Sequence, residues 1–432
     1  MVRYYFSLAI GGLQRTPWLA LLMVLTLAIG LSTCMITIAL RHALAMDPVP
    51  GKSLRLLNLQ DPSVPYEAGA RFSYGEAGQL TRMGAPDAVS SESGMGTVTS
   101  ISVAGQRVAM DGGLGIRYAT AGFFAMFDIS LERGRVWTRD EEQSAAPVAL
   151  ISEDLAAELF PHASPLGHQV GVGDTQYTVI GVLRPWNPQP HYIDLTLGAF
   201  GTGGAGIYLP VKTIRYAPDD MLVFQRCPRS HPSLALPADL LSSACGWLSV
   251  WYLVPFEQDV SRLTHAVESQ LPEVFPATPA SKLHLLNVRQ IVADVVPASV
   301  NLYALLGVIF LVLCVVNASG MQLSRLMRGT AQIGIRRALG ASRLDIVKQY
   351  LCDALLVGGA GGMAGMMLTF VGMYFVRQLP LGEVRYAQMA YMDGTMFALM
   401  VLLVFVCSAL AGVVPAWMAS RADPALVIKA AQ

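Results

Sequence analysis

The residues whose types and spacing could carry chemistry gather in one short connection of this 432-residue chain. Residues 322–349 lie between two apolar runs and contain a single acid, Asp345. Against it stand six basic residues: Arg325, Arg328, Arg336, Arg337, Arg343 and Lys348. Positive charge at this density beside apolar runs indicates which side of a membrane the connection faces. Setting this orientation could be the only role of the charge, or the connection could also bind a partner.

The pattern inside this connection predicts two helices. Ile335, Ala338 and Leu339 fall on one side of a short amphipathic helix, with Gln332 and Arg336 on another side. The pair 340–341, Gly-Ala, ends it, and the sequence SRLD at 342–345 fits a capping box that begins a second helix. The second helix continues into the next apolar run. A short helix joined stiffly to a membrane helix has the geometry of a lever.

The other candidate sites favour no catalysis. The sequence PGKS at 50–53 resembles the end of a phosphate-binding loop, but Met46 occupies the position where that motif needs a glycine, and no strand precedes it. No Ser/His/Asp arrangement or carboxylate pair can be argued. We therefore expect no catalytic residue, no metal and no cofactor. The histidines have no metal-ligand spacing: His42, His162, His168, His191, His231, His265 and His284.

Three features of the apolar runs each have two interpretations. Methionines at helical spacing could pass copper, although adaptable packing explains them as well: Met389, Met392, Met396 and Met400, with Met366 and Met367 nearby. Asp353 could take part in proton coupling, or it could lie at headgroup level beside the basic connection. The GxxxG pairs allow close helix packing, either fixed or shifting during a transport cycle: Gly358 with Gly362, and Gly361 with Gly365.

Composition indicates the elements that must position these residues. The chain is 53% hydrophobic and 14% charged, whereas a soluble domain is nearer a quarter charged. Its formal net charge is zero, so no nucleic-acid partner is expected. Four runs are long enough to cross a bilayer, which takes about 20 helical residues. The first is longer than the apolar part of a signal peptide, so we expect it to remain as an anchor.

Basic residues in the connections predict the orientation. Arg3 and Arg15 precede the first run without an acid, whereas the last connection carries balanced charge. Both termini and the basic connection are therefore expected in the cytoplasm of a multi-pass membrane protein. The resulting segments are 1–17, a cytoplasmic amphipathic helix; 18–41, 299–321, 350–376 and 395–417, the four spans; 42–298, an extracytoplasmic α+β domain; 322–349, the basic connection; 377–394, a short outer loop; and 418–432, a cytoplasmic tail.

The outer domain is expected to mix helices and strands, in one lobe or two. Residues 53–60 and 282–292 are interpreted as strands, and turns at Gly105 and at 173–174 predict two hairpins. Ser152 is expected to cap a helix, and a strand followed by a helix is expected within 248–275. The Pro- and Gly-rich stretch 185–237 is interpreted as a long loop or insertion.

The cysteines agree with this placement. Cys34, Cys314, Cys352 and Cys407 fall in the spans and are interpreted as small apolar residues. The remaining pair, Cys227 and Cys245, lies in the outer domain, where an oxidising compartment would let it form a disulfide. Both could also remain free thiols.

The order of several stretches resembles the MacB/FtsX-type permeases of ABC transporters. The strongest is QIGIRRALGASRLDIVKQYLCDALL at 332–356. Others are YYFSLAIGGLQRTPWLALLMVLTLAIGLS near the N-terminus, ATAGFFAMFDISLERGRVW, PVALISEDLAAELF, PLGHQV and YTVIGVL in the outer domain, and VPAWMASRADPALVIKA near the C-terminus. The resemblance covers most of the chain and is weakest across 185–237.

This resemblance implies a protein of the bacterial inner membrane with four spans and a periplasmic domain between the first two. The same resemblance implies a dimer of two copies or of unlike permeases. It also implies a cytoplasmic ABC ATPase that binds ATP and Mg²⁺. We expect that ATPase in a separate chain. The residues that match the family's coupling helix, which docks on the ATPase, are Gln332, Ile333, Gly334, Ile335, Arg336, Arg337, Ala338, Leu339, Gly340 and Ala341. Gln332 departs from the acid usual at its position.

The expected function is therefore a non-catalytic permease subunit that converts cytoplasmic ATP hydrolysis into movement of a periplasmic domain. Export or extraction of a peptide, an antibiotic-like molecule or another lipophilic substrate is expected, with lipoprotein release as an alternative. A membrane sensor with the same lever is a second alternative, although it should carry a cytoplasmic signalling domain. The sequence does not indicate the substrate, the direction of transport, or whether a periplasmic adaptor and an outer-membrane channel take part.

Overall fold

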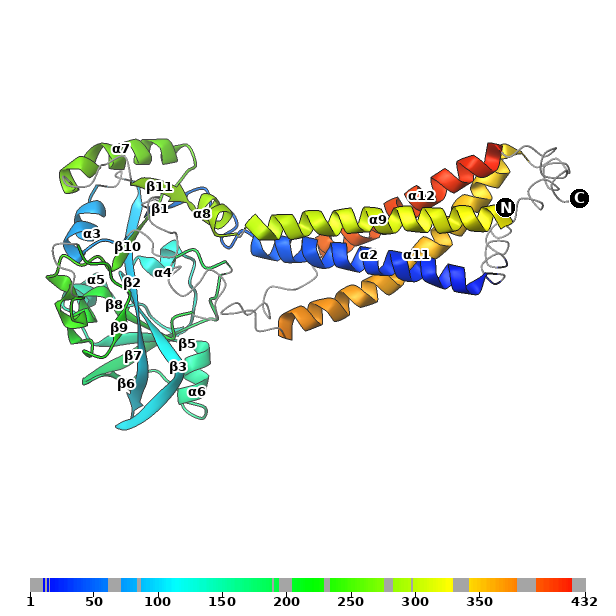
Figure 1. Cartoon of the computed structure of the whole chain (residues 1–432). Helices are drawn as coiled ribbons and strands as arrows, with labels where there is room; N and C mark the ends of the chain where they lie inside the picture. Colours follow the sequence, from blue (N-terminus) through cyan, green and yellow to red (C-terminus); the bar gives the residue numbers. More distant parts are fainter. Residues whose placement is uncertain are drawn as a thin grey trace, which may run out of the picture. The chain divides into compact units, whose positions relative to one another are not determined.

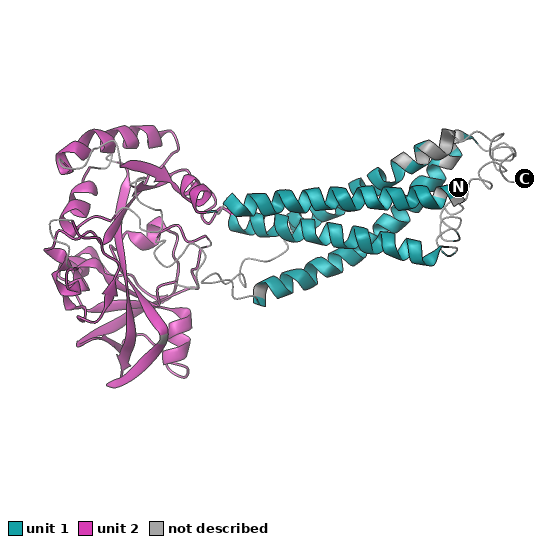
Figure 2. Ribbon diagram, in the orientation of Figure 1, with its two compact units in different colours: residues 1–44, 296–381, 385–432 teal, residues 45–295, 382–384 magenta. Residues whose placement is uncertain are grey.

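The computed structural model describes residues 11, 14, 16–60, 71–83, 87–188, 190–193, 204–228, 234–275, 283–296, 298–328, 342–378 and 394–421. It divides the chain into two compact units (Figure 2). Unit 1 comprises residues 1–44, 296–381 and 385–432, and unit 2 comprises residues 45–295 and 382–384. The predicted arrangement is confirmed: four membrane-length helices, with an α/β domain inserted between the first and the second.

Unit 1 consists of four long helices (Figure 1). They are α2 (Pro17–Leu44), α9 (Ala298–Arg328), α11 (Arg343–Gln378) and α12 (Gly394–Arg421). Each contains a window apolar enough to cross a membrane. α11 has 36 residues, which is about 54 Å of helix at 1.5 Å per residue. Since a bilayer core is about 30 Å thick, α11 extends well beyond the hydrocarbon.

The helices of unit 1 pack mainly through apolar side chains, with polar contacts near their ends. α2 packs against α9 and α11, and α12 packs against α11 and α9. Met23 and Leu27 of α2 are buried with Ala318 of α9 and Val357 of α11. Near the end of α2, Arg41 Nε donates to Asn301 Oδ1 of α9 at 2.8 Å. That bond joins the last turn of one helix to the first turn of the next.

The described residues of unit 2 contain one eleven-stranded sheet. The strands run in the order β11-β1-β10-β2-β3-β8-β5-β7-β4, while β6 pairs with β2 and β7, and β9 pairs with β2. Their bounds are β1 Leu56–Gln60, β2 Val89–Val103, β3 Gln106–Ala119, β4 Leu131–Gly134, β5 Val148–Ser152, β6 Gln169–Val172, β7 Thr175–Leu183, β8 Ile207–Pro210, β9 Leu222–Val223, β10 Leu248–Leu253 and β11 His284–Asn287.

The pairs β3–β8 and β5–β7 are parallel and the other pairs are antiparallel. The strands that enter and leave the unit, β1 and β11, pair directly, with Asn58 opposite Leu286. Helices α3 (Tyr74–Leu80), α4 (Phe123–Met126), α5 (Arg139–Gln143), α6 (Glu153–Leu159), α7 (Asp259–Val274) and α8 (Val288–Val295) accompany the sheet, together with the 3₁₀ helices η2 (Val211–Tyr216) and η3 (Pro237–Leu241).

Local sequence explains several of these elements. β2 and β3 form the predicted hairpin, and Ala104 and Gly105 have φ values of 50° and 79° at its turn. Residues in this left-handed region match the twist of a two-residue hairpin. The second predicted hairpin joins β6 to β7. Ser152 Oγ accepts from the Leu155 N–H at 3.3 Å, so it caps α6 as predicted. The predicted strand and helix within 248–275 are β10 and α7.

Two predictions about unit 2 are wrong. The segment 282–292 contributes only the four-residue strand β11, because Asn287 begins helix α8. Its side chain accepts from the Gln290 N–H at 2.9 Å, and Gln290 Oε1 accepts from the Asn287 N–H at 3.0 Å, a reciprocal cap that stops the strand. The stretch 185–237 is not a plain loop either, because it supplies β8, η2 and β9.

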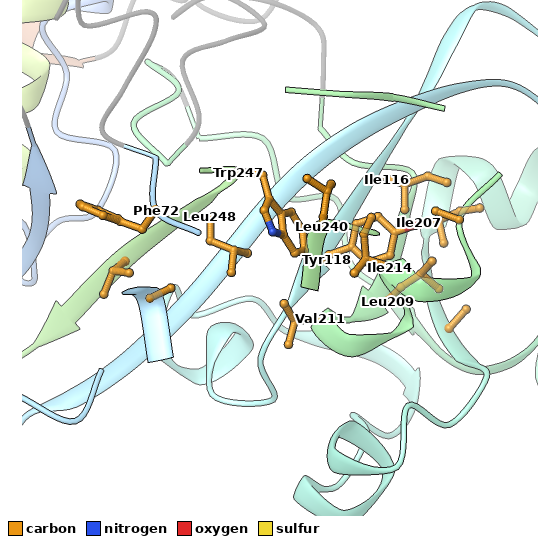
Figure 3. Close-up of a cluster of buried hydrophobic side chains, with 14 of the residues drawn as sticks. Phe72, Ile116, Tyr118, Ile207, Leu209, Val211, Ile214, Leu240, Trp247 and Leu248 are labelled. Atoms are coloured by element: carbon orange, nitrogen blue, oxygen red, sulfur yellow. The ribbon is translucent and has the colours of Figure 1, made fainter. Parts of the chain in front are cut away.

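The core of unit 2 explains why β8 forms within a Pro- and Gly-rich stretch. Ile207 and Leu209 of β8 and Ile214 of η2 are at most 1% exposed, and they gather around Tyr118 (Figure 3). The Tyr118 ring meets the Trp247 ring edge-on, with centroids 6.1 Å apart. Burial of these apolar side chains outweighs the weak strand propensity of their flanks.

Candidate functional site

The predicted partner-binding residues 332–341 lie outside the described residues. The structure describes both helices that flank them. α9 ends at Arg328, and α11 begins at Arg343. The described part of the candidate site therefore consists of these two helix ends and their contacts. Any force that the connection receives must pass through them.

α11 begins with the predicted capping box. Ser342 Oγ accepts from the Asp345 N–H at 3.2 Å, and Asp345 Oδ2 accepts from the Ser342 N–H at 3.2 Å. The Ser342 hydroxyl also donates to Asp345 Oδ2 at 2.6 Å. These bonds satisfy donors that a helix start leaves open, so the helix forms from its first residue and continues without interruption to Gln378.

An ion pair joins α9 to α11 near these ends. Arg325 Nη1 donates to Asp353 Oδ2 at 3.0 Å. Their side chains are 10% and 12% exposed, so water screens the pair little. Of the two interpretations of Asp353, this contact favours a structural position beside the basic connection. A charge in such a place needs a partner, and the pair makes it costly to separate the two helices here.

The four glycines predicted to pack membrane helices lie on two faces of α11. A Cβ added at Gly361 would lie 3.0 Å from Leu27 Cβ of α2, and one at Gly365 would lie 3.1 Å from the Ala28 carbonyl oxygen. On the other face, a Cβ at Gly362 would lie 2.6 Å from the Val404 methyl carbons of α12. A Cβ added at Gly358 would lie even closer to the Ser408 side chain of α12. α11 therefore packs closely against α2 and α12 at once.

Unit 2 contains a buried carboxyl cluster that the sequence did not indicate. Glu92 of β2 is 7% exposed. Burial raises the pKa of its carboxyl to about 7, and Thr81 Oγ1, which donates to Glu92 Oε1 at 3.1 Å, counteracts part of that rise. Glu142 accepts from the Ala121 N–H at 2.6 Å, and burial raises the pKa of its carboxyl too. Burial is the main cause of the raised pKa of Glu92, and repulsion from the Glu142 carboxylate adds to it.

The remaining candidates have structural contacts. Lys52 of the PGKS sequence pairs with Asp128, Nζ to Oδ1, at 2.6 Å. Met396 and Met400 are buried at 6% and 0% exposure, whereas Met389 and Met392 lie outside the described residues. Within the described ranges, no group of three His, Cys, Asp or Glu side chains could hold a metal ion. His284 Nδ1 lies 3.5 Å from Glu268, and the His168 ring contacts Phe160.

Cys227 and Cys245, the pair expected to form a disulfide, are bonded to each other in unit 2. The bond joins the segment after β9 to the start of β10, beside a backbone pair between Arg226 and Gly246. The four span cysteines are free, as expected. The sequence indicated this pair only because both cysteines lie in the domain expected in an oxidising compartment. No local sequence pattern distinguishes them.

Two known protein families match parts of this chain. Residues 20–226 match the MacB-like periplasmic core domain, and residues 304–424 match the FtsX-like permease C-terminal domain. The macrolide export ATP-binding/permease protein MacB of Shewanella sp. (strain W3-18-1) is 26% identical over 312 residues, which is 70% of this chain and 41% of that protein. The chain thus spans less than half of that relative's length.

Two further relatives differ more. The uncharacterized ABC transporter permease YknZ of Bacillus subtilis (strain 168) is 22% identical over 310 residues, 70% of this chain and 66% of that protein. The crystal structure of the periplasmic region of MacB from Actinobacillus actinomycetemcomitans aligns with 57% of this chain and 95% of that one, at 11% identity and a TM-score of 0.39. A structural likeness of that strength carries no further argument.

Proposed function

Since this chain is an ABC transporter permease of the MacB/FtsX type, we propose that it couples ATP hydrolysis on a separate cytoplasmic ATPase to movement of unit 2. The connection 329–341 would receive the force, and α11 would transmit it. The MacB relative named above combines ATP-binding and permease parts in one name, whereas YknZ is named as a permease alone. In the present proposal the two parts are separate chains, and the permease acts as a dimer of two copies or of unlike partners.

The observation that supports this function best is the mechanical continuity of α11. Its capped start follows the connection directly, and its 36 residues run without a break. Gly361 and Gly362 hold it close to α2 and α12, and Asp353 ties it to α9. A displacement of its first turn would therefore reach all three other helices. A plain connector needs none of these contacts.

The proposed coupling requires the connection and unit 2 to lie on opposite sides of the membrane. The excess of Lys and Arg supports a cytoplasmic position of the connection and a periplasmic position of unit 2. Thiol labelling of intact cells should modify a cysteine introduced by Glu158→Cys, an exposed position of unit 2, and should leave one introduced by Arg337→Cys unlabelled. The opposite result would reverse the proposed orientation. The substrate that we propose is a lipophilic or peptide-like molecule taken from the periplasm or the outer leaflet.

Charge reversal within the connection tests the coupling. Arg336→Glu combined with Arg337→Glu should weaken ATPase binding, because reversal places like charges together at the interface or leaves a partner unpaired. Arg328→Glu combined with Arg343→Glu is the matched control, because it reverses the same number of charges within 322–349 at the two helix ends that flank the connection 329–341. The readouts are co-purification of the ATPase and its hydrolysis rate in the reconstituted complex. If both double variants bind and stimulate the ATPase equally, the segment serves topology alone.

A further inference from the structure

Arg117 is a buried cation that forms no ion pair within the described residues, although Asp47 and Asp128 act with it on the pKa of Tyr192. It lies in β3, opposite Met95 of β2 and Tyr208 of β8, and is 5% exposed. Its Nη2 donates to Met95 Sδ at 3.4 Å, and a thioether is a weak acceptor. Its Nε and Nη1 have no hydrogen-bond partner in the part of the chain that the structure describes. Since a guanidinium does not lose its proton in proteins, unit 2 buries a full positive charge here.

The contacts present do not offset this charge. The Arg117 Cζ lies 5.5 Å from the centroid of the Phe123 ring, a cation–π contact. Such a contact contributes less than a buried ion loses when it leaves water, because the ring carries only a quadrupole. Buried arginines ordinarily have an acidic partner. An acceptor of opposite charge is therefore the missing part of this arrangement.

Two further donors lie in the same aromatic cluster. Tyr192 and Trp251 are 2% and 0% exposed, and neither the Tyr192 hydroxyl nor the Trp251 Nε1 has a partner within the described residues. Their rings meet edge-on with centroids 5.7 Å apart. Phe127 contacts both of them and also Phe123, with centroids 6.0, 5.3 and 4.7 Å away. Within the described residues, the cluster thus holds donors on three residues, Arg117 Nε and Nη1, the Tyr192 hydroxyl and Trp251 Nε1, that have no acceptor.

We propose that these five residues, Arg117, Phe123, Phe127, Tyr192 and Trp251, named here the Arg117 cluster, bind a small monovalent anionic group. The donors and the charge select an anion, and burial of every member selects a small one. Either a free halide or the carboxylate of an organic acid has this chemistry. The site goes beyond the proposed transport function and does not depend on it.

The test is anion-dependent stability of the full chain in detergent. Thermal midpoints are measured from tryptophan fluorescence at constant sodium concentration, with the bulky anion gluconate replaced stepwise by chloride, bromide or acetate. A ligand that binds only the folded state should raise the midpoint saturably, by about 5–10 °C at 100 times its dissociation constant. A rise with the halides alone identifies a free halide, and a rise with acetate alone identifies a carboxylate. No rise with any of them overturns the proposal.

Variants separate this site from general salt effects. Arg117→Met keeps the side-chain length and removes the charge, so it should abolish the anion dependence and should not lower the midpoint in gluconate. Arg107→Met is the matched control, since Arg107 is an exposed residue of the same strand, and it should keep the dependence. Equal dependence in Arg117→Met and the wild type would place the anion elsewhere and refute the assignment.

Two measurements keep the proposal testable if Arg117→Met fails to fold. Crystals of the wild type grown with bromide should give an anomalous peak within hydrogen-bond distance of the Arg117 guanidinium, and an empty map at that point in crystals that bind bromide elsewhere would refute a halide site. Asp194 stands two positions after Tyr192 in the sequence. If Asp194→Asn destabilises the protein and makes its stability depend on an added anion, the chain itself supplies the counter-charge and the proposal is wrong.

Discussion

Glu92→Gln should remove a pH dependence from the stability of unit 2. Burial raises the pKa of the Glu92 carboxyl from its ordinary 4.5 to about 7 in the folded state. Between these values the folded protein holds a proton that the unfolded chain has lost. Stability therefore falls as the pH rises from about 4.5 to about 7, and the loss is complete above that range. This sign is opposite to that of an ion-paired carboxylate.

The magnitude follows from the same values. Each pKa unit corresponds to about 1.36 kcal/mol, so ionised Glu92 lowers the free energy of unfolding by about 3 kcal/mol at pH 8. For a domain of this size, about 3 kcal/mol corresponds to roughly 6–12 °C in thermal midpoint. Gln retains an acceptor for the Thr81 hydroxyl and does not ionise. The thermal midpoint of the variant minus that of the wild type should therefore increase by roughly 6–12 °C between pH 5 and pH 8.

The assay is thermal unfolding of the full chain in detergent at half-unit pH steps. The quantity compared is the difference between variant and wild type, which cancels the titration of groups that do not interact with Glu92. Glu158→Gln is the control, because Glu158 is an exposed carboxylate of the same unit, and its difference from the wild type should stay flat. Parallel curves for Glu92→Gln and the wild type would refute the argument that burial governs this carboxyl.

Three further predictions concern contacts described above. Asp353→Asn should lower the free energy of unfolding by about 3–5 kcal/mol, since it leaves Arg325 buried and unpaired; adding Arg325→Met should restore most of it, and an unrecovered double variant would contradict the pairing. Cys227→Ser should lower the midpoint, because the disulfide closes a loop of 18 residues worth about 3 kcal/mol; intact mass should rise by two hydrogens when the wild type is reduced. Gly362→Val should lower stability by about 1–3 kcal/mol through overpacking, whereas Gly359→Val, at a position with nothing within 4 Å, should not; equal losses would argue against close packing at Gly362.

Sequence patterns predicted the features that depend on near neighbours. The four spans, the turn at Gly105, the cap at Ser152 and the start of α11 at Ser342 each depend on residues a few positions apart. Physical preferences at that range act before tertiary packing and can be recognised without it. The family resemblance supplied the order of these elements and the expected partner.

Features that depend on distant residues were not predicted. β8 is stable because Ile207 and Leu209 are buried against strands from elsewhere in the chain. Asp353 has its partner 28 residues away on another helix. The burial of Arg117 has no local signal at all, since its flanks resemble any other strand. The reciprocal cap of Asn287 and Gln290 was present in the sequence, but the apolar residues around it were given more weight.

The direct pairing of β1 with β11 makes unit 2 a removable module. The chain enters and leaves the unit along neighbouring strands, and the helices on either side, α2 and α9, already contact each other through Arg41 and Asn301. A short turn could therefore join Leu44 to Ala298 without rearranging the bundle. Recombination could exchange one domain for another at these two points and keep the membrane part intact. Unit 2 and the helices of unit 1 are thereby free to evolve at different rates.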